Sequence, residues 1–261
     1  MSHSARKDVF HAMFIHKIPP GVSKEEFESK FESLADEAVQ LPVVKKNLTK
    51  VELIIQNEKV DEHTPKFGFS PREHVVFAAV QSESFTLQTP EHLFQVLADP
   101  EVRKLMAKSK EFGLHDSSYA FSADVDAKID NPAPQDGAHM ICVYNVPAHA
   151  SSQKHDKIYH EYLNNDFIRV PAVKKHFVRF EVWQSNNVLD EHIRAFGYSP
   201  AGPTFLHHAK LDSWDSTFEM MTDSEAHKSI LDSGNNGKDF DLKTNGYVCA
   251  CHVVTKLDNS V

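Results

Sequence analysis

The chain has 261 residues, a formal net charge of −9 and 41% hydrophobic residues, including 18 Phe. This hydrophobic content is ample for a buried core, so we expect a globular protein rather than a disordered one. The negative charge, with no basic stripe to offset it, disfavours sequence-independent nucleic-acid binding, which needs clustered Lys and Arg.

No apolar run approaches the ~18 residues of a membrane span, and the N-terminal segment MSHSARKDVF lacks the apolar stretch of a secretory signal. Three cysteines, an odd number, fit reduced thiols better than a disulfide framework. We therefore expect a soluble, cytoplasmic protein without a nucleic-acid or membrane partner. Whether it forms a homodimer stays open.

The predicted elements begin with a strand over residues 11–18, which ends at the turn sequence Pro-Pro-Gly. Ser23 and Glu26 form a capping box, and the helical spacing of apolar residues after it predicts a helix that ends before Pro42. The remaining predicted elements are a strand over 48–55, a strand over 75–80, a helix from Pro90 and a strand over 119–125. This order is a split βαβ pattern, which forms a four-stranded antiparallel sheet with both helices on one face.

The whole pattern is then repeated. HAMFIHKIP from His11 aligns without a gap on HMICVYNVP from His139, a shift of 139 − 11 = 128 residues. LPVVKK and VPAVKK, FGFSP and FGYSP, and the two fourth strands match further along in the same order. We therefore predict a first repeat over residues 1–130, a linker over 131–138 and a second repeat over 139–261. Because each sheet has one face without helices, the two sheets should pack face to face with a cavity between them.

This repeated order, with a helix running into Leu41-Pro42 or Val170-Pro171 and a strand just beyond, resembles the dimeric α+β barrel superfamily. The closest likeness is to its EthD-like group, in a tandem single-chain form of the kind found in fungal metabolism. The resemblance implies an α+β fold of two ferredoxin-like βαββαβ repeats that form an intramolecular dimeric α+β barrel. Members include cofactor-free oxygenases, polyketide cyclases, decarboxylases, dehydratases, isomerases, haem enzymes and stress proteins, so the fold does not fix the function. A histidine frequent in EthD-like sequences is replaced here by Leu34 and Leu163, so an activity that needs it is not implied.

The first strand of each repeat offers two faces, because side chains alternate along a strand. The aliphatic set, expected to face the helices, is Met13, Ile15, Ile141 and Val143. The mixed set, expected to face the cavity, is Phe14, His16, Cys142 and Tyr144. His16 and Tyr144 should then occupy equivalent places, where each could transfer a proton or simply form a hydrogen bond at the strand end.

The second strand of each repeat carries a cation and a carboxylate two residues apart. The residues assigned to the cavity are Lys50, Glu52 and Ile54 in the first repeat and Arg179, Glu181 and Trp183 in the second. Buried charges are costly unless they are paired or used, so these form either a structural ion-pair network or a ligand site. In a ligand site, Arg179 would clamp a carboxylate or phenolate and Glu181 would act as a base.

The third and fourth strands of the second repeat carry histidines at positions where the first repeat has other residues. His207 and His208 match Ala79 and Val80, and they point to opposite faces, so at most one of them faces the cavity. His252 could join that histidine and Glu181 in a site built mainly from the second repeat. No recognised metal-ligand spacing is present, so no metal is expected.

The aromatic residues of FGFSP and FGYSP lie in the loop before the third strand, where they form either a lid over the cavity or a structural turn. The leading functional prediction is a cofactor-independent lyase or isomerase of secondary metabolism. It would act by proton transfer on an aromatic or polyketide-like compound held between the sheets. The predicted catalytic residues are His16, Tyr144, Glu181, His208 and His252. The predicted substrate-binding residues are Phe14, Lys50, Glu52, Arg179, Trp183 and His207. The alternatives are a non-catalytic ligand-binding or stress protein and a cofactor-free or haem monooxygenase.

Overall fold

A computed structural model of the protein describes residues 9–69, 74–83, 90–115, 118–132, 134, 136–148, 152–232 and 242–259. Ser70 and Pro71 of the FGFSP segment lie outside these ranges, as do two residues of the predicted linker. Within the described ranges, none of the helices combines the length and apolar character that a membrane crossing needs.

The first repeat has the predicted order of elements. Its strands are β1 (Val9–Lys17), β2 (Lys50–Asn57), β3 (Val75–Glu83) and β4 (Tyr119–Asp130). Its helices are α1 (Lys24–Gln40), α2 (Pro42–Asn47), the 3₁₀ helix η1 (Thr64–Phe67), α3 (Glu91–Ala98) and α4 (Pro100–Glu111). The Ser23 side chain caps α1 by accepting a hydrogen bond from the Glu26 backbone, as the capping box predicts. The short α2 and the division of the second helix at Asp99, which caps α4, were not predicted.

The second repeat follows the same plan. Its strands are β5 (Ala138–Asn145), β6 (Phe177–Asn186), β7 (Ser199–Pro200), β8 (Thr204–Leu211) and β9 (Gly246–Asp258). Its helices are α5 (Ser152–Asn165), η2 (Phe167–Arg169), α6 (Pro171–His176), α7 (Asp190–Ala195), α8 (Trp214–Thr222), α9 (Ser224–Leu231) and α10 (Leu242–Asn245).

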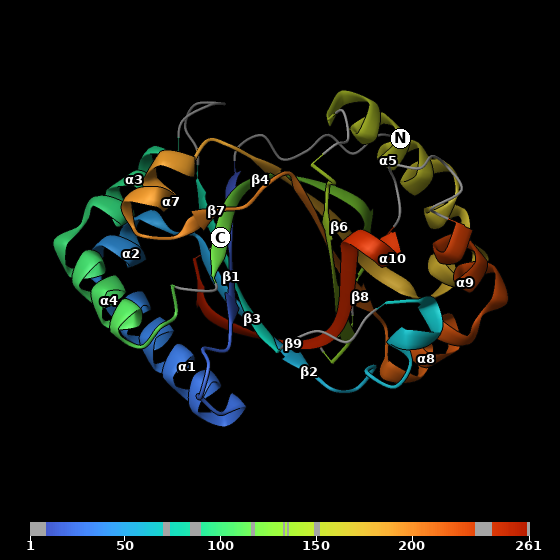
Figure 1. Ribbon diagram of the computed structural model, residues 1–261, viewed down its shortest axis with the longest axis horizontal. Helices are drawn as coiled ribbons and strands as arrows, with labels where there is room; N and C mark the ends of the chain where they lie inside the picture. The colour runs from blue at the N-terminus through green and yellow to red at the C-terminus, as the bar shows by residue number, and fades with distance from the viewer. Residues whose placement is uncertain are drawn as a thin grey trace.

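The strands close into one barrel. Their order is β1-β3-β2-β9-β5-β8-β6-β4, and β4 pairs again with β1, so eight antiparallel strands form a ring with the two-residue β7 beside β4. The last strand of each repeat joins the repeats, because β9 pairs with β2 and β4 pairs with β6. Figure 1 shows the barrel flanked by one group of helices on each side. The predicted fold class, two βαββαβ repeats that form an intramolecular dimeric α+β barrel, is confirmed.

The interior of the barrel is filled with side chains from both repeats. The buried cluster there consists of Met13, Ile15, Ile54, Val75, Phe77, Ala79, Phe121, Ala123, Ile141, Val143, Trp183, Leu206, Tyr247, Cys249 and Cys251. An eight-stranded barrel is just wide enough for its own side chains, so this apolar packing leaves little central space. The open ring in Figure 1 is therefore a packed core, and the two repeats share it.

The predicted faces of the first strands are reversed. Met13, Ile15, Ile141 and Val143 face the barrel interior rather than the helices. Phe14 and His16 face the helices of the first repeat, and Tyr144 faces α5 of the second. The reason is that the closed barrel needs aliphatic side chains to fill it, whereas space for larger mixed side chains remains between each sheet and its helices.

Each repeat also extends a segment over the other. Phe67 and Phe69, which follow β2, pack among residues of the second repeat, and His227 of α9 is hydrogen-bonded to the Lys66 carbonyl at 2.9 Å. In return, Leu189 just before α7, Ile193 within α7 and Tyr198 after it pack among residues of the first repeat. Figure 1 shows α7, in orange, among the blue and green helices, and the cyan segment after β2 beside α8.

Candidate functional site: a cavity between sheet and helices

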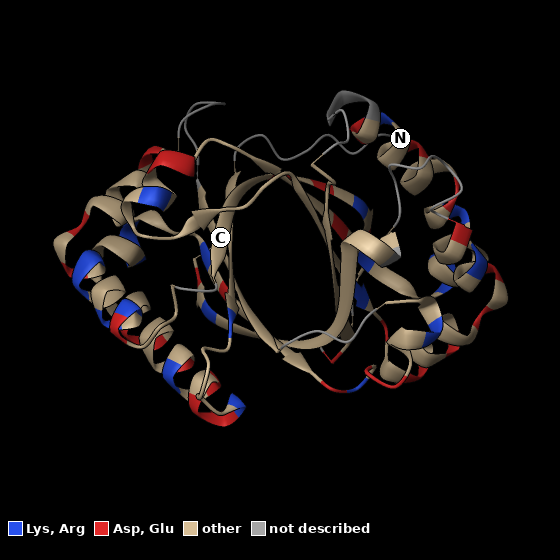
Figure 2. Ribbon diagram, viewed as in Figure 1, with Lys and Arg blue, Asp and Glu red and all other residues tan. Residues whose placement is uncertain are grey.

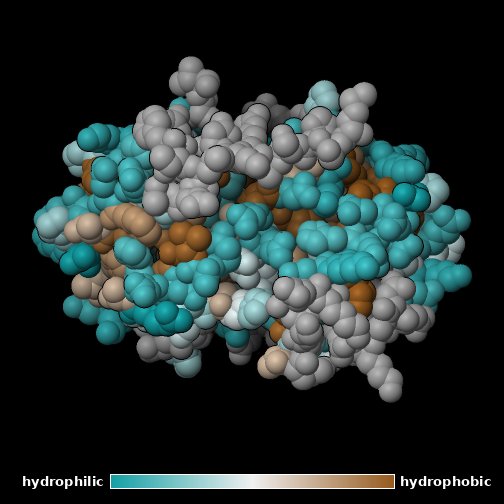
Figure 3. All heavy atoms as spheres, turned by 90° about the horizontal axis from the view of Figure 1, so that it is seen from above, coloured by the Kyte–Doolittle hydropathy of each residue, from teal (hydrophilic) through white to brown (hydrophobic). Residues whose placement is uncertain are grey.

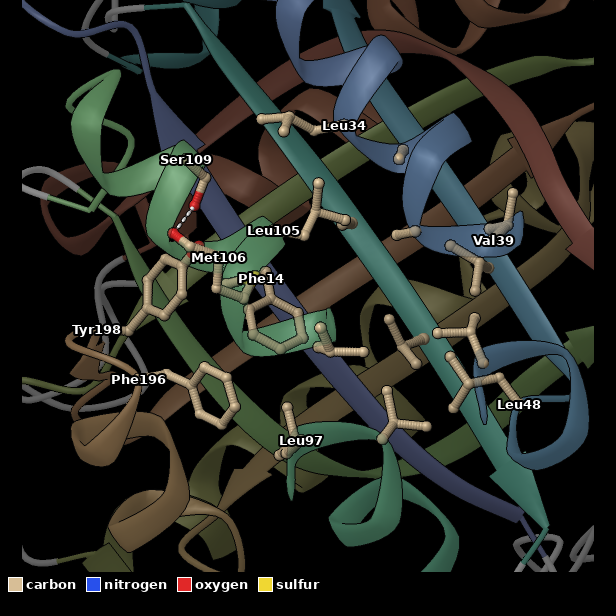
Figure 4. Close-up of a pocket in the computed structure, with 18 of the residues that line it drawn as sticks. Phe14, Leu34, Val39, Leu48, Leu97, Leu105, Met106, Ser109, Phe196 and Tyr198 are labelled. Atoms are coloured by element: carbon tan, nitrogen blue, oxygen red, sulfur yellow. Dashed lines mark hydrogen bonds between the residues drawn. The ribbon is translucent and has the colours of Figure 1, made fainter. Parts of the chain in front are cut away.

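The first repeat contains an apolar cavity of about 180 Å³ between its sheet and its helices. Its walls come from β1, β2, β3, α1, α3 and α4 and are closed by α7 and the segment after it. Figure 4 shows Leu34, Val39 and Leu48 on one side and Phe14, Leu97, Phe196 and Tyr198 on the other. In Figure 3, hydrophobic atoms surround a hollow on the left, over the region where Figure 1 places α3 and α7.

One end of this cavity is polar. His16, Ser109 and Tyr198 line it, and His115 and Ser118 stand behind them. The His16 ring lies 4.5 Å from the Phe31 ring and 5.7 Å from the Tyr198 ring, measured between centroids. An apolar pocket with a few converging polar groups is the usual form of a small-molecule site.

The hydrogen bonds of His16 fix its tautomer. Its Nδ1 lies 3.1 Å from Ser118 Oγ, and the Ser118 hydroxyl donates its only proton to the Leu114 carbonyl. His16 Nδ1 must therefore carry a proton and donate it, which leaves Nε2 as the basic nitrogen. Burial lowers the pKa of His16 to about 3, so the imidazole is neutral near pH 7.

The second repeat has a smaller cavity of about 90 Å³ in the equivalent place. The registers of β1 and β5 show why, since Val76 and Ala78 of the first repeat correspond to the larger Phe205 and His207. Tyr159 stacks on Phe205 at 3.8 Å and is hydrogen-bonded to His207. Aromatic side chains thus occupy in the second repeat the space that stays open in the first.

The predicted catalytic residues do not come together. His16 lies in the first cavity, whereas Tyr144 lies across the barrel, where its hydroxyl is 2.8 Å from His155 Nε2. Glu181 and His208 face the barrel interior, and His208 Nε2 lies 3.0 Å from His139 Nδ1. His252 is exposed on the outer side of β9, so its predicted place beside Glu181 is wrong. The reason is the alternation along β9, which turns Cys249 and Cys251 inward and His252 outward.

The predicted substrate-binding residues are also divided. Phe14 lines the first cavity, and His207 lines the second. The sequence alignment matched His207 and His208 with Ala79 and Val80, but the strand registers shift this match by one residue. Met13 pairs with Ala79, and the equivalent Ile141 pairs with His208. His207 and His208 therefore correspond to Ala78 and Ala79. Trp183 belongs to the barrel interior.

The charged residues of β2 and β6 form ion pairs within their own strands. Lys50 Nζ lies 2.8 Å from Glu52 Oε1, and Arg179 Nε lies 2.9 Å from Glu181 Oε1. Glu181 and Glu52 both lie close enough to raise the pKa of Arg179, so the pairs also interact across the barrel. Figure 2 shows that most other charged residues lie on the outer helices. In the described part of the chain, no three His, Cys, Asp or Glu side chains gather in a way that could hold a metal ion.

Four polar residues of the cavity were missed by sequence reasoning: Ser109, His115, Ser118 and Tyr198. Only Tyr198 had a signal, since it belongs to the FGYSP segment that was considered as a lid. The others lie in α4 and the segment after it, where a lone Ser or His has no distinctive spacing.

No family model and no curated protein sequence matches this chain. Among the solved structures that match it, two do so over nearly their whole length. An anthrone oxidase-like protein is 12% identical with a TM-score of 0.60, covering 100% of this chain and 99% of its own. A candidate monooxygenase from Fusobacterium nucleatum subsp. nucleatum is 8% identical with a TM-score of 0.57, covering 97% of this chain and 96% of its own. The chain has the fold of the dimeric α+β barrels. At these identities the likeness establishes the fold alone.

Proposed function

We propose that this chain is an enzyme that removes a proton from a small aromatic compound bound in the first cavity. The observation that carries the proposal is a neutral histidine, His16, held in one tautomer at the end of an otherwise apolar cavity. Dehydration, cyclisation and isomerisation begin with such a proton removal, and decarboxylation uses the reverse transfer, which adds a proton to the carbon that loses CO₂. From the sequence resemblance, we also propose that the chain is related to the EthD-like group.

The size of the cavity limits the substrate. A cavity of about 150 Å³ holds benzene, so the 180 Å³ here suits one aromatic ring with small substituents. A haem macrocycle does not fit this volume, which argues against the haem alternative at this site.

The environment of His16 also limits the chemistry. A protonated imidazole is disfavoured in this apolar site, as its low pKa shows. Proton transfer becomes favourable when an anion forms beside the ring, because opposite charges attract strongly where water is excluded. A substrate whose conjugate base is an enolate or phenolate meets this condition.

A second candidate is a cofactor-free oxygenase, in which the deprotonated ring reacts with O₂. It is favoured by the names of two of the matching structures, one anthrone oxidase-like and the other a candidate monooxygenase. Both candidates begin with the same proton transfer and differ only in whether O₂ is consumed afterwards. Measuring O₂ consumption with an oxygen electrode therefore distinguishes them. O₂ uptake equal to substrate turnover indicates the oxygenase, and product formation without uptake indicates a lyase or isomerase.

Replacing His16 with Asn is expected to slow proton removal by about 10²-fold or more, as is usual for the loss of a general base. The assay is deuterium exchange into single-ring phenolic acids and phenyl ketones, followed by NMR. His155→Asn, a buried histidine of the second repeat, is the control and should keep most of the wild-type rate. Exchange at the wild-type rate in His16→Asn would rule out this base. Tight binding of these compounds with no exchange in the wild type would favour the non-catalytic carrier.

A further inference from the structure

The barrel interior has one charged end. Beyond the apolar cluster, the inward-facing positions, which recur at every second residue of a strand, carry histidines and charged residues. These residues are His11 of β1, Lys50 and Glu52 of β2, His139 of β5, Arg179 and Glu181 of β6, and His208 and Lys210 of β8. All of them except Glu181 are at least partly exposed, so solvent reaches the barrel interior at this charged end. In Figure 2, blue and red segments of the strands border the ring.

Lys210 is placed so that its positive charge is poorly compensated. In the strand register it lies directly opposite Arg179 on one side and His139 on the other. Like charges directly opposite each other on one face of a sheet repel. Arg179 is paired with Glu181, and Asp130 lies opposite it on the neighbouring strand. Lys210 forms no ion pair with any residue in the described ranges, so its charge is open to an added anion.

The imidazoles beside Lys210 lie in a positive electrostatic potential. His139 Nδ1 is 3.0 Å from His208 Nε2, so the two rings share one hydrogen bond. Burial and nearby cations together lower the pKa of each ring to about 3. The cations are Lys50, Arg179 and Lys210 for both rings. The potential that disfavours a proton on these imidazoles stabilises an anion beside them.

The deeper part of the charged end holds two buried polar atoms without a partner among the described residues. Trp183 occupies the inward position next to Glu181 and is 3% exposed. Its Nε1 can only donate a hydrogen bond, and no acceptor from the described residues meets it. His11 Nδ1 is likewise unpartnered, and the rings of His11 and Trp183 meet edge to face with centroids 5.0 Å apart. Because an unpaired buried donor is costly, this place suits a ligand that brings an acceptor.

We propose that the charged end of the barrel binds a small carboxylate, held by the charge of Lys210 and hydrogen-bonded to the indole N–H of Trp183. A carboxylate fits both observations, because it carries one negative charge and its oxygens only accept hydrogen bonds. The site lies on the opposite face of the sheet from the first cavity, since Met13 and His16 point to opposite faces of β1. It is therefore a second site and does not depend on the proposed function.

Sodium acetate is the probe, and the indole N–H of Trp183 reports on its binding directly. The chain has two Trp residues, so a proton–nitrogen NMR spectrum contains two indole signals, which the variant Trp214→Phe assigns. We expect acetate to move the Trp183 signal downfield, as a new hydrogen bond does, and to leave the Trp214 signal in place. Sodium chloride at the same ionic strength should move neither signal.

Lys210→Gln tests the role of the charge. Gln is the matched replacement because Gln81 holds the equivalent position in the first repeat, where it pairs with His11 as Lys210 pairs with His139. The acetate Kd from the NMR titration should rise by about 10-fold or more, as expected for a lost hydrogen bond to a charged group. Lys210→Arg keeps the charge and should bind acetate with a Kd close to that of the wild type. Lys228→Gln, at an exposed position of α9, changes the net charge equally and should leave the Kd unchanged.

A Trp183 signal that does not respond to acetate in the wild type would overturn the proposal. An unchanged Kd in folded Lys210→Gln, or an equal response to chloride, would do the same. Each readout concerns binding at the charged end, so the outcome is independent of whether His16 acts as the base.

Discussion

Lowering the pH from about 7.5 to about 4.5 is expected to destabilise the fold by roughly 5 kcal/mol, from two buried histidines alone. Burial lowers the pKa of both His16 and His207 to about 3, against an ordinary value of 6.5. The unfolded chain therefore binds a proton at each site as the pH falls through 6.5, whereas the native chain stays neutral there until about pH 3. Their contribution to stability is complete above pH 6.5 and is lost below it, at about 1.4 kcal/mol per pH unit for each histidine.

This loss is large compared with the ~5–15 kcal/mol that stabilises a typical domain. His139 and His208 act in the same direction, since burial lowers the pKa of each to about 3. Urea unfolding at several pH values between about 4.5 and 7.5 measures the effect. His207→Gln should flatten the pH dependence, and the exposed His252→Gln should leave it unchanged. Equal midpoints across this range would show that the buried histidines are not kept neutral by the fold.

Replacing Phe121 with Ala is expected to cost about 3–5 kcal/mol of unfolding free energy, the usual cost of deleting a fully buried aromatic ring. Phe121 is 1% exposed and packs in the barrel interior with residues of both repeats. The closed strands cannot collapse around the space that the ring leaves, so the cavity should persist. Because the core is shared, we expect both repeats to unfold together in one transition.

The matched control is Phe14→Ala. Phe14 has the same ring but is only half-buried and already borders empty space, so its loss should cost roughly 1–2 kcal/mol. Urea unfolding monitored by Trp fluorescence and by far-UV circular dichroism measures both variants. Equal losses for the two positions, or two separate transitions in Phe121→Ala, would contradict a packed core shared by the repeats.

Much of the architecture follows from the sequence alone. The shift between His11 and His139 reveals the repeat, and the capping box at Ser23 marks the first helix. Periodicity gives the order of strands and helices, because these signals depend on neighbours along the chain. The matching βαββαβ halves then restrict the fold to two sheets that cover each other.

The location of the candidate site was decided by tertiary structure. Alternation along β1 shows that Met13 and His16 point to opposite faces, but it does not show which face is enclosed by the barrel. Closure of the eight strands selects the aliphatic face for the interior and leaves His16 under the helices. The same closure separates His16 from Glu181 and His208, so the predicted catalytic set is split between two layers.

Local periodicity and capping are enough to give the repeat, the order of its elements and the α+β class. Only the folded structure shows that the cavity of the first repeat stays open while aromatic rings such as Phe205 make that of the second smaller. It also decided that Tyr198 completes a site in the other repeat. Free volume and contacts between distant segments depend on how whole layers pack against each other, and no short stretch of sequence contains that information.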